Sequence, residues 1–413
     1  MGWVEHAIWW HVYPLGFSGA PIREPDATPG PRLRRLLGWL DYAVELGASG
    51  LLLGPVFTSA THGYDSLDQF QVDPRLGGDA DLDELIAAAH ARGLRVVLDG
   101  VFSHVSADHP ELLRALDEGP SSPSAALFDI DWHAADGPAP RVFEGHEALA
   151  RLDHTTPQAV EYVTAVMSHW LDRGIDGWRL DAAYSLDPGF WAQVLPRVRA
   201  QHPDAWFLGE VIHGDYSDFV DASGVDSVTQ YELWKAISSS ITDRNFFELD
   251  WALARHNDFL AHFTPNTFIG NHDVTRIASA LGADGAITAL AILLTVGGIP
   301  SIYAGDEQGF TGIKEHRLGG DDAVRPAFPD TPDQLAVWGH TIHRAHQDLI
   351  GLRRRHPWLA TATTTTVSVD NTVYAYRVGA RDGHDHLDVR IDLDSRPTIT
   401  IRNAAGDTLW TQQ

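Results

Sequence analysis

The chain has no cysteine, and this absence removes two kinds of chemistry at once. Neither a disulfide nor a thiolate metal site can form without cysteine. Basic residues are also few, because 30 lysines and arginines stand against 56 aspartates and glutamates, for a formal net charge of −26. So acidic a surface repels phosphate backbones and anionic membrane surfaces. We therefore expect no nucleic-acid partner and no membrane partner.

Long hydrophobic runs are missing too, since none reaches the ~20 residues of a membrane helix. The run "AITALAILLTVGGIP" at 286–300 ends at a Gly-Gly pair and predicts a buried helix. The opening, "MGWVEHAIWWHVYPLGF", lacks the basic segment of a signal peptide, and His6 and His11 interrupt its apolar run. We interpret it as a first strand whose Trp9 and Trp10 pack in the core, and we expect a cytoplasmic protein.

The 413 residues, 44% of them hydrophobic, are enough to bury a large core. Up to about residue 355, short apolar runs alternate with helical patterns such as "DLDELIAAAHARG", which is typical of parallel strands joined by helices. There are eight such runs: "AIWWHVYPL", "ASGLLLGPV", "LRVVLDGVF", "DGWRLD", "AWFLGEV", "DSVTQYE", "NTFIGNHD" and "GIPSIYAGDE". Eight strand–helix units close a barrel with its active site at the carboxyl ends of the strands. The sequence thus predicts an α/β fold on a (β/α)8 TIM barrel.

Two segments fall outside this pattern. Residues 105–153, which follow the third run, contain "EGPSSPSAAL" and "ADGPAPR" and predict a small loop-rich insertion over the barrel mouth. From 361 onward the runs become β-rich, as in "TVYAYRV" and "PTITIRN", with turn signals between them. We therefore expect a barrel from 1–104 and 154–360, an insertion domain at 105–153, and a short antiparallel β domain at 361–413.

Polar residues gather at the ends of the predicted strands. They are Asp99, His104, Arg179, Asp181, Glu210, Asn271, His272 and Asp273. Arg179 and Asp181 stand two apart on one strand and therefore point to the same side. Such a pair can be a purely structural ion pair, and a single carboxylate at a strand end is more often a helix cap or loop anchor. Only the whole set indicates catalysis.

The set contains three carboxylates, no thiol and no glycine-rich phosphate loop, which leaves acid–base and nucleophilic chemistry. Cleavage of a glycosidic bond needs one carboxyl to protonate the leaving oxygen and one to attack or to activate water. Asp181 and Glu210, on adjacent strands, can fill these roles. We expect an ionised Asp181 beside Arg179 and a protonated Glu210 near the anion of Asp273.

A metal-dependent barrel hydrolase is another alternative. It would require a His-x-His at the end of the first strand, where "WWHVYP" has one histidine. The sequence "GHDH" at 383–386 falls in a turn of the predicted β domain, far along the chain from the carboxylates. A non-catalytic barrel that serves as a binding module would have lost one of the carboxylates, and all three are present. We therefore expect no metal site.

Four segments carry a resemblance to a known family. They are "DGVFSH" at 99–104, "GWRLDAAYS" at 177–185, "FLGEV" at 207–211 and "FIGNHD" at 268–273. Together with "HGYDSLDQFQVDPRLGG" and "GIPSIYAGDEQG", they make the chain resemble the α-amylase family of glycoside hydrolases over nearly its whole length. The resemblance implies that Asp181 is the nucleophile, Glu210 the general acid/base and Asp273 the transition-state stabiliser. It further implies a sugar site formed by Tyr64, Asp99, His104, Arg179 and His272.

The segment "ALARLDHTTPQAVEYV" is similar to one that marks the cyclomaltodextrinase, neopullulanase and maltogenic amylase branch of that family. Members of the branch usually carry an N-terminal β domain used in dimerisation, whereas this chain enters the predicted barrel within its first ten residues. We therefore expect the branch without its N-terminal domain, as a monomer or as a homodimer formed another way. The partner implied is an α-glucan oligosaccharide.

Three departures from the family pattern affect what the resemblance implies. Ser103 stands where the family usually has a calcium-binding Asn, Tyr184 and Ser185 replace a Lys-His pair, and Ile212 replaces a frequent aromatic. Calcium, which the family can use, is therefore not expected here, nor is any other cofactor. The resemblance implies a retaining hydrolase of α-1,4 bonds in short linear or cyclic maltooligosaccharides. A transglycosylase with the same residues and an α-glucosidase stay open as alternatives.

Overall fold

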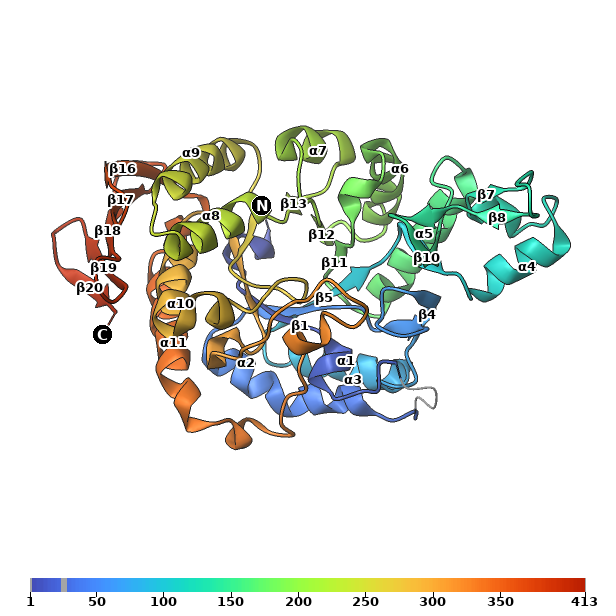
Figure 1. The fold of residues 1–413 in the computed structure, drawn as a ribbon, viewed down its shortest axis with the longest axis horizontal. Coiled ribbons are helices and arrows are strands. Elements are labelled where there is room, and N and C mark those ends of the chain that lie inside the picture. The colour runs from blue at the N-terminus through green and yellow to red at the C-terminus, as the bar shows by residue number, and fades with distance from the viewer. Residues whose placement is uncertain (1, 24–27, 413) are drawn as a thin grey trace.

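The computed structural model describes residues 2–23 and 28–412, and its centre is a parallel barrel (Figure 1). The barrel strands, in spatial order, are β13 (Ser227–Val228), β12 (Trp206–Gly209), β11 (Gly177–Leu180), β5 (Arg95–Gly100), β2 (Gly50–Leu53), β1 (Trp9–Val12), β15 (Ile299–Tyr303) and β14 (Asn266–Phe268). A single parallel bridge between Thr229 and Asn266 joins the two ends of this sheet. All eight predicted strands are therefore confirmed, and so is the TIM barrel.

Helices surround the barrel and bury the outer faces of its strands. The α-helices of the described chain are α1 (Pro14–Phe17), α2 (Leu40–Leu46), α3 (Asp79–His90), α4 (Pro110–Glu118), α5 (Pro157–Asp172), α6 (Pro188–Arg199), α7 (Tyr216–Ser223), α8 (Tyr231–Thr242), α9 (Phe247–His262), α10 (Ile277–Thr295) and α11 (His340–Arg355), of which α4 lies away from the barrel. Short 3-10 turns add η1 (Trp3–His6), η2 (Arg32–Trp39), η3 (Ala125–Leu127), η4 (Ala183–Ser185), η5 (Asp306–Gln308), η6 (Asp322–Val324), η7 (Pro332–Gln334), η8 (Val337–Gly339) and η9 (Pro357–Thr361). Because the strands are covered on both faces, β2 and β12 are buried at every position.

Local sequence explains where two of these helices begin. The side chain of Thr156 accepts a hydrogen bond from the amide of Ala159, and Pro157 occupies the first turn of α5. Asp187 caps α6 in the same way, again followed by a proline. A capping oxygen satisfies a free amide, and proline lacks the amide that would be left over. The cap of α5 fixes the point at which the chain returns from the segment after β5, and the cap of α6 fixes the point at which it leaves the end of β11, next to the predicted site.

Helix α10 contains most of the run that predicted a buried helix. Among the described residues it is the one helix long and apolar enough to cross a membrane. It packs instead against α8, α11 and β19 (Thr398–Asn403), and from Gly285 to Thr295 every residue is buried. The helix is broken at Gly282, whose φ is +69°, and it ends before the Gly297–Gly298 pair. It is a core helix, as predicted.

The chain makes an excursion between β5 and α5, at one end of the molecule (Figure 1). It contains α4 and small antiparallel sheets made of β6 (His104–Ser106), β7 (Ile130–Asp131), β8 (Ala139–Pro140), β9 (Val142–Phe143) and β10 (His146–Arg151). A second hairpin, β3 (Phe57–Ser59) and β4 (Ser66–Val72), follows β2. The predicted loop-rich insertion after the third strand is confirmed, whereas its limits at 105 and 153 stay a prediction.

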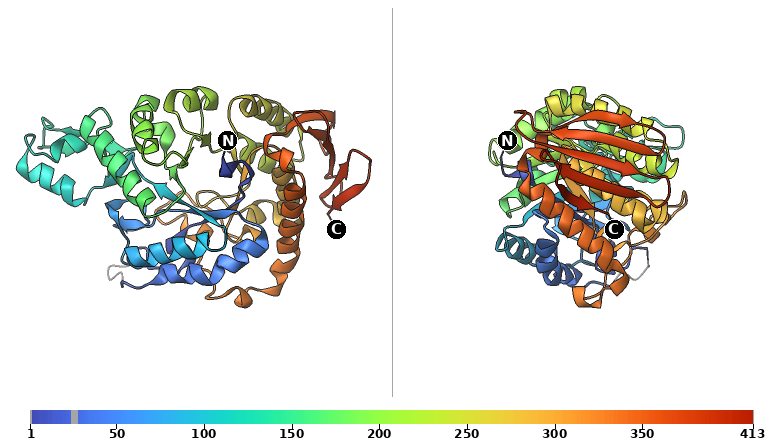
Figure 2. Two further views of the ribbon diagram at one scale, coloured as in Figure 1. Left: turned by 180° about the vertical axis from the view of Figure 1, so that it is seen from behind. Right: turned by 90° about the vertical axis from the view of Figure 1, so that its left-hand side faces the viewer.

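The C-terminal segment forms a five-stranded antiparallel sheet at the opposite end (Figures 1 and 2). Its strands are β16 (Thr363–Val369), β17 (Val373–Gly379), β18 (His386–Asp392), β19 and β20 (Thr408–Thr411). One face of the sheet packs on α9, α10 and α11. The sequence predicted four of these strands and missed β20, whose "TLWT" is too short to show a clear alternation. The antiparallel β domain itself is confirmed.

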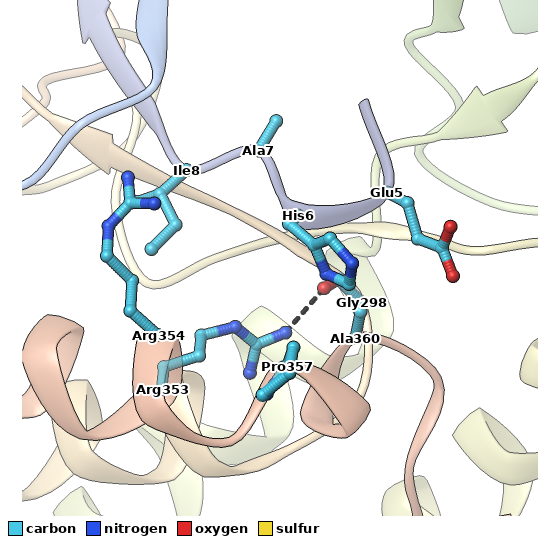
Figure 3. A pocket seen from close by; sticks show the side chains of 9 residues that line it. All are labelled: Glu5, His6, Ala7, Ile8, Gly298, Arg353, Arg354, Pro357 and Ala360. Carbon is cyan, nitrogen blue, oxygen red and sulfur yellow. Dashed lines mark hydrogen bonds between the residues drawn. The ribbon is translucent and has the colours of Figure 1, made fainter. Parts of the chain in front are cut away.

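The end of the barrel opposite the predicted site contains a small cavity of about 190 Å³ (Figure 3). Ile8 and Gly298, which precede β1 and β15, line it together with Arg353. The guanidinium of Arg353 donates hydrogen bonds to the carbonyls of Leu294, Val296 and Gly298. It thereby satisfies carbonyls at the end of α10, so this cavity belongs to the structural face of the barrel.

Candidate active site

Arg179 lies at the centre of the candidate site and contacts three carboxylates. Its Nη1 is 2.7 Å from both carboxylate oxygens of Asp99 and 3.2 Å from Oδ1 of Asp181, and its Nη2 is 2.8 Å from Oε1 of Glu210. The strand register explains this, because Arg179 of β11 pairs with Asp99 of β5 and with Leu208 of β12. The polar ends of three neighbouring strands therefore meet at one guanidinium.

One positive charge cannot neutralise three ionised carboxylates, and all four side chains are buried. Burial, and after it the negative charge of Glu210, raises the pKa of Asp181 well above its ordinary value, although Arg179 acts in the opposite direction. Burial also raises the pKa of Asp99. The ionised Asp181 stays an expectation, and burial opposes it, because the sequence argument counted Arg179 but not the cost of burial.

Glu210 is held by three donors. Its Oε1 accepts from Arg179 and from the hydroxyl of Tyr231 at 3.0 Å, and its Oε2 accepts from the amide of Ala182 at 2.9 Å. Tyr231 is fixed in turn by the side-chain amide of Asn271, at 2.9 Å. Ala182 adopts a left-handed conformation with φ +44°, which is costly for a residue other than glycine. That strained turn aims its amide at the carboxylate.

Asp273 stands in a different environment, with 31% of its side chain exposed. Its Oδ2 lies 2.9 Å from Nε2 of His272, and its Oδ1 accepts from Nη2 of Arg325 at 2.7 Å. Burial alone would raise the pKa of Asp273, but His272, then Arg325 and Arg179 outweigh it and hold this pKa well below its ordinary value. Asp273 is therefore ionised across the neutral range.

Aromatic rings line the side of the site next to Asp273. The ring of His272 is parallel to those of Tyr64 and Tyr13, with centroids 5.5 and 6.1 Å apart. The hydroxyl of Tyr64 donates to Oδ2 of Asp99 at 3.1 Å and is also hydrogen-bonded to Nε2 of His272. Flat apolar faces with polar edges are suited to a sugar ring, whose own faces are apolar and whose rim carries hydroxyls.

His104 is buried beneath the insertion and has partners for both ring nitrogens. Nδ1 lies 2.8 Å from Oγ of Ser103, and Nε2 lies 2.8 Å from the carbonyl of Tyr64. Burial lowers the pKa of His104 to about 4, so the ring is neutral at pH 7. The expected part of His104 in the sugar site stays a prediction, and both of its ring nitrogens have partners within the protein.

The eight residues singled out as catalytic or substrate-binding form one continuous cluster through the contacts above. Sequence reasoning missed Arg325, Tyr13 and Tyr231, which contact members of that cluster. Tyr13 directly follows the first strand, and Tyr231 lies three residues beyond the sixth, so the rule about strand ends could have identified both. Arg325 lies 22 positions beyond β15 in an irregular segment, and nothing in its local sequence distinguishes it.

The described residues include no group of three or more histidines or carboxylates arranged to hold a metal ion. At the position expected to matter for calcium, the hydroxyl of Ser103 faces Nδ1 of His104.

Comparison with known proteins gives concordant matches. The family described as the α-amylase catalytic domain matches residues 32–333. A cyclomaltodextrinase from a Bacillus species is 30% identical over 98% of this chain and 75% of its own length. A cyclomaltodextrinase from Geobacillus thermopakistaniensis is 28% identical over 94% of this chain and 69% of its own. The crystal structure of the Nostoc punctiforme debranching enzyme, soaked with acarbose, superposes with a TM-score of 0.80 at 28% identity and covers 97% of this chain and 92% of its own.

Proposed function

Because the chain belongs to the α-amylase family of glycoside hydrolases, we propose that it is a retaining enzyme that cleaves α-1,4-glucosidic bonds in short linear or cyclic maltooligosaccharides. The observation that carries the proposal is the single guanidinium of Arg179, 3.2 Å from Asp181 and 2.8 Å from Glu210. It holds two carboxyls beside each other at the ends of adjacent strands. A pair about 5–5.5 Å apart is the arrangement of retaining enzymes, since no water fits between the carboxyls.

In the first step, an ionised Asp181 attacks the anomeric carbon while Glu210 gives its proton to the glycosidic oxygen. The carbon–oxygen bond to the leaving sugar breaks, and that sugar departs with the proton. In the second step, Glu210 takes a proton from water, the water oxygen bonds to the anomeric carbon, and Asp181 is released. The three carboxyls around Arg179 suit this scheme, because the productive state places a proton on Glu210 and leaves Asp181 charged.

Asp273 stabilises the positive charge that develops at the anomeric carbon in both steps. It is suited to this role because it is ionised and partly exposed, between His272 and Arg325. The parallel rings of Tyr64 and His272 form the platform for the sugar that is transferred to Asp181. The two cyclomaltodextrinase relatives support the choice of short and cyclic glucans as substrates.

Product analysis on a panel of cyclic glucans, maltotriose and soluble starch tests the proposal. We expect kcat/KM to be higher for cyclic and short linear glucans than for starch. Proton NMR of the first product should show the α anomer, because two displacements restore the original configuration. An initial β anomer contradicts the mechanism, and a preference for starch of more than about tenfold contradicts the substrate class.

A second candidate is cleavage at branch points, favoured by the likeness to a debranching enzyme that covers most of both chains. The same carboxylates serve an α-1,6 bond, so the panel should include panose, which contains both linkages. Cleavage of the α-1,6 bond of panose releases glucose and maltose in equal amounts, and this result would favour the second candidate. Products longer than the substrate would instead identify a transglycosylase.

We also propose that the reaction needs no calcium. The hydroxyl of Ser103 is engaged with His104, whereas calcium requires six to eight oxygen ligands. Activity should therefore survive dialysis against a chelator. Loss of activity that added calcium alone restores would contradict this proposal.

A further inference from the structure

A hydrogen bond joins the insertion to the barrel close to the catalytic carboxylates. The hydroxyl of Tyr184, in η4, donates to Oε1 of Glu144 at 2.9 Å. Glu144 lies in the turn between β9 and β10 and is exposed, whereas Tyr184 is half-buried. Neither residue is part of the catalytic cluster described above. We refer to this contact as the Tyr184–Glu144 bridge.

The bridge lies next to Asp181 and Glu210. Tyr184 follows Asp181 by three residues, and its amide donates to the carbonyl of Glu210 at 3.2 Å. Its ring lies 5.3 Å from the ring of His213, which follows Glu210 by three residues. In the barrel, β11 and β12 lie across from β15 and β1, and Tyr13 directly follows β1. The strands that precede Tyr184 and His213 therefore lie across the barrel from the strand that precedes Tyr13.

The turn that carries Glu144 is braced, so the bridge is more than a contact between two loose side chains. The adjacent Phe143 packs on His104 with ring centroids 4.3 Å apart. Strand β10 pairs with both β6 and β9, which ties the turn to the end of β5. Glu144 has a φ of +47°, which only a constrained non-glycine residue adopts. The carboxylate is thus held out toward Tyr184.

We infer that the Tyr184–Glu144 bridge is a specificity determinant that closes the leaving-group end of the cleft and favours leaving groups of one or two glucose units. The inference rests on the proposed function. A long leaving chain has to pass the bridge and break it, whereas a short one fits between it and Glu210. The ring of Tyr184 and the carboxylate of Glu144 also offer a flat face and a hydroxyl acceptor to the first leaving sugar.

Two single variants break the bridge from opposite sides. Tyr184→Phe keeps the ring and removes the hydroxyl, and Glu144→Ala removes the acceptor. The measurement is the ratio of kcat/KM for soluble starch to kcat/KM for maltotriose. A hydrogen bond of about 1 kcal/mol that a long chain must break predicts an increase of about fivefold in this ratio for either variant.

The double variant distinguishes one shared contact from two separate effects. If the bridge is the determinant, Tyr184→Phe combined with Glu144→Ala raises the ratio no further than either change alone. Glu144→Gln retains an oxygen acceptor and should stay near the wild-type ratio. Glu147→Ala, on the exposed part of the same hairpin, is the control for hairpin perturbation and should leave the ratio unchanged. A ratio within twofold of wild type in both single variants, or additive increases in the double variant, overturns the inference.

Hydrolysis of α-maltosyl fluoride separates this inference from the proposed function. Its leaving group is one atom, so the rate of fluoride release measures the activity of the catalytic carboxylates and does not depend on the leaving-group end of the cleft. If the protein releases fluoride but the starch-to-maltotriose ratio of the variants equals that of the wild type, the bridge is not a specificity determinant. The proposed function as a glycoside hydrolase then still holds. Absence of activity on the fluoride and on every glucan in the wild-type protein rejects the proposed function itself.

Discussion

Arg179 has more carboxylate neighbours than its one positive charge can balance. This excess of carboxylates determines the chemistry of the site. The guanidinium touches Asp99, Asp181 and Glu210, of which Asp99 is completely buried. Placing a proton among these groups costs less than keeping all three ionised in a buried site. A retaining glycosidase needs one protonated and one ionised carboxyl, and carboxyls crowded around one cation favour such a mixture.

Neutral isosteres at the two central carboxyls should abolish the reaction. Asp181→Asn removes the nucleophile, and Glu210→Gln removes the proton donor, while each keeps the size of the side chain. We expect kcat/KM on maltotriose to fall by more than about a hundredfold in each, with an unchanged circular dichroism spectrum. Activity within about tenfold of wild type in either variant would falsify the assigned role.

Arg325 should act as a positioning residue whose loss is visible in the pH profile. It contacts Oδ1 of Asp273 at 2.7 Å and is one of the cations that lower the pKa of this carboxyl. In Arg325→Gln the pKa of Asp273 rises, so the carboxylate is lost at a higher pH as the solution is acidified. The acid limb of kcat/KM should therefore move to higher pH.

Arg325→Lys is the control for this prediction, since it retains the charge and should shift the acid limb less. A purely structural role for Arg325 would lower the rate at every pH and leave the limb in place. That result, obtained with folded protein, would contradict the prediction.

The sequence was sufficient to place the main site residues, because strand ends in a parallel barrel converge on one face. Asp99, Arg179 and Asp181 could be grouped from the alternation of strands alone. The protonation state of Asp181 could not be predicted, since it depends on burial and on three charges that meet only in the folded chain. Arg325 was out of reach for the same reason, as a long irregular segment carries it to Asp273.

Among the elements, β11 depends on a glycine at its first position. A Cβ on Gly177 would lie 2.2 Å from the backbone carbonyl oxygen of Trp206, where β11 and β12 approach each other. Because that obstacle is backbone, it cannot move aside without displacing β12. Gly177→Ala should therefore lower the free energy of unfolding by about 3 kcal/mol, measured from urea transitions.

Gly379, in β17, is a matched control in a strand of the C-terminal sheet. A Cβ there meets no atom within 4 Å, so Gly379→Ala should change the free energy of unfolding by less than about 0.5 kcal/mol. Equal effects of the two substitutions would mean that the barrel accommodates the methyl group at Gly177.

Strand prediction succeeded where apolar runs were long and failed where pairing alone defines the strand. The runs around β2 and β12 are fully buried and stand out by composition. Strand β20 has only four residues, none of them buried, and is defined by its hydrogen bonds to β19. Such an edge strand leaves little trace in a hydrophobic pattern, because its neighbour decides its conformation.

At the scale of the whole molecule, the insertion and the C-terminal sheet lie at opposite ends of the barrel (Figure 2). The insertion reaches the site directly, through Phe143 on His104 and Glu144 on Tyr184. The described strands of the C-terminal sheet instead pack on α9, α10 and α11, on the outside of the barrel. Changes in the insertion should therefore alter substrate choice, whereas changes in the C-terminal sheet should alter stability.

The barrel closes through one bridge, between Thr229 and Asn266, and this seam lies close to the residues that hold Glu210. Tyr231 follows Thr229 by two positions, and its partner Asn271 belongs to the loop after β14. On heating, a seam with so few hydrogen bonds opens before the tryptophan-rich interior is exposed. Catalysis should then fail in a barrel that is still folded. The midpoint of thermal inactivation should fall below that of the intrinsic fluorescence transition, and coincident midpoints would show that seam and interior melt together.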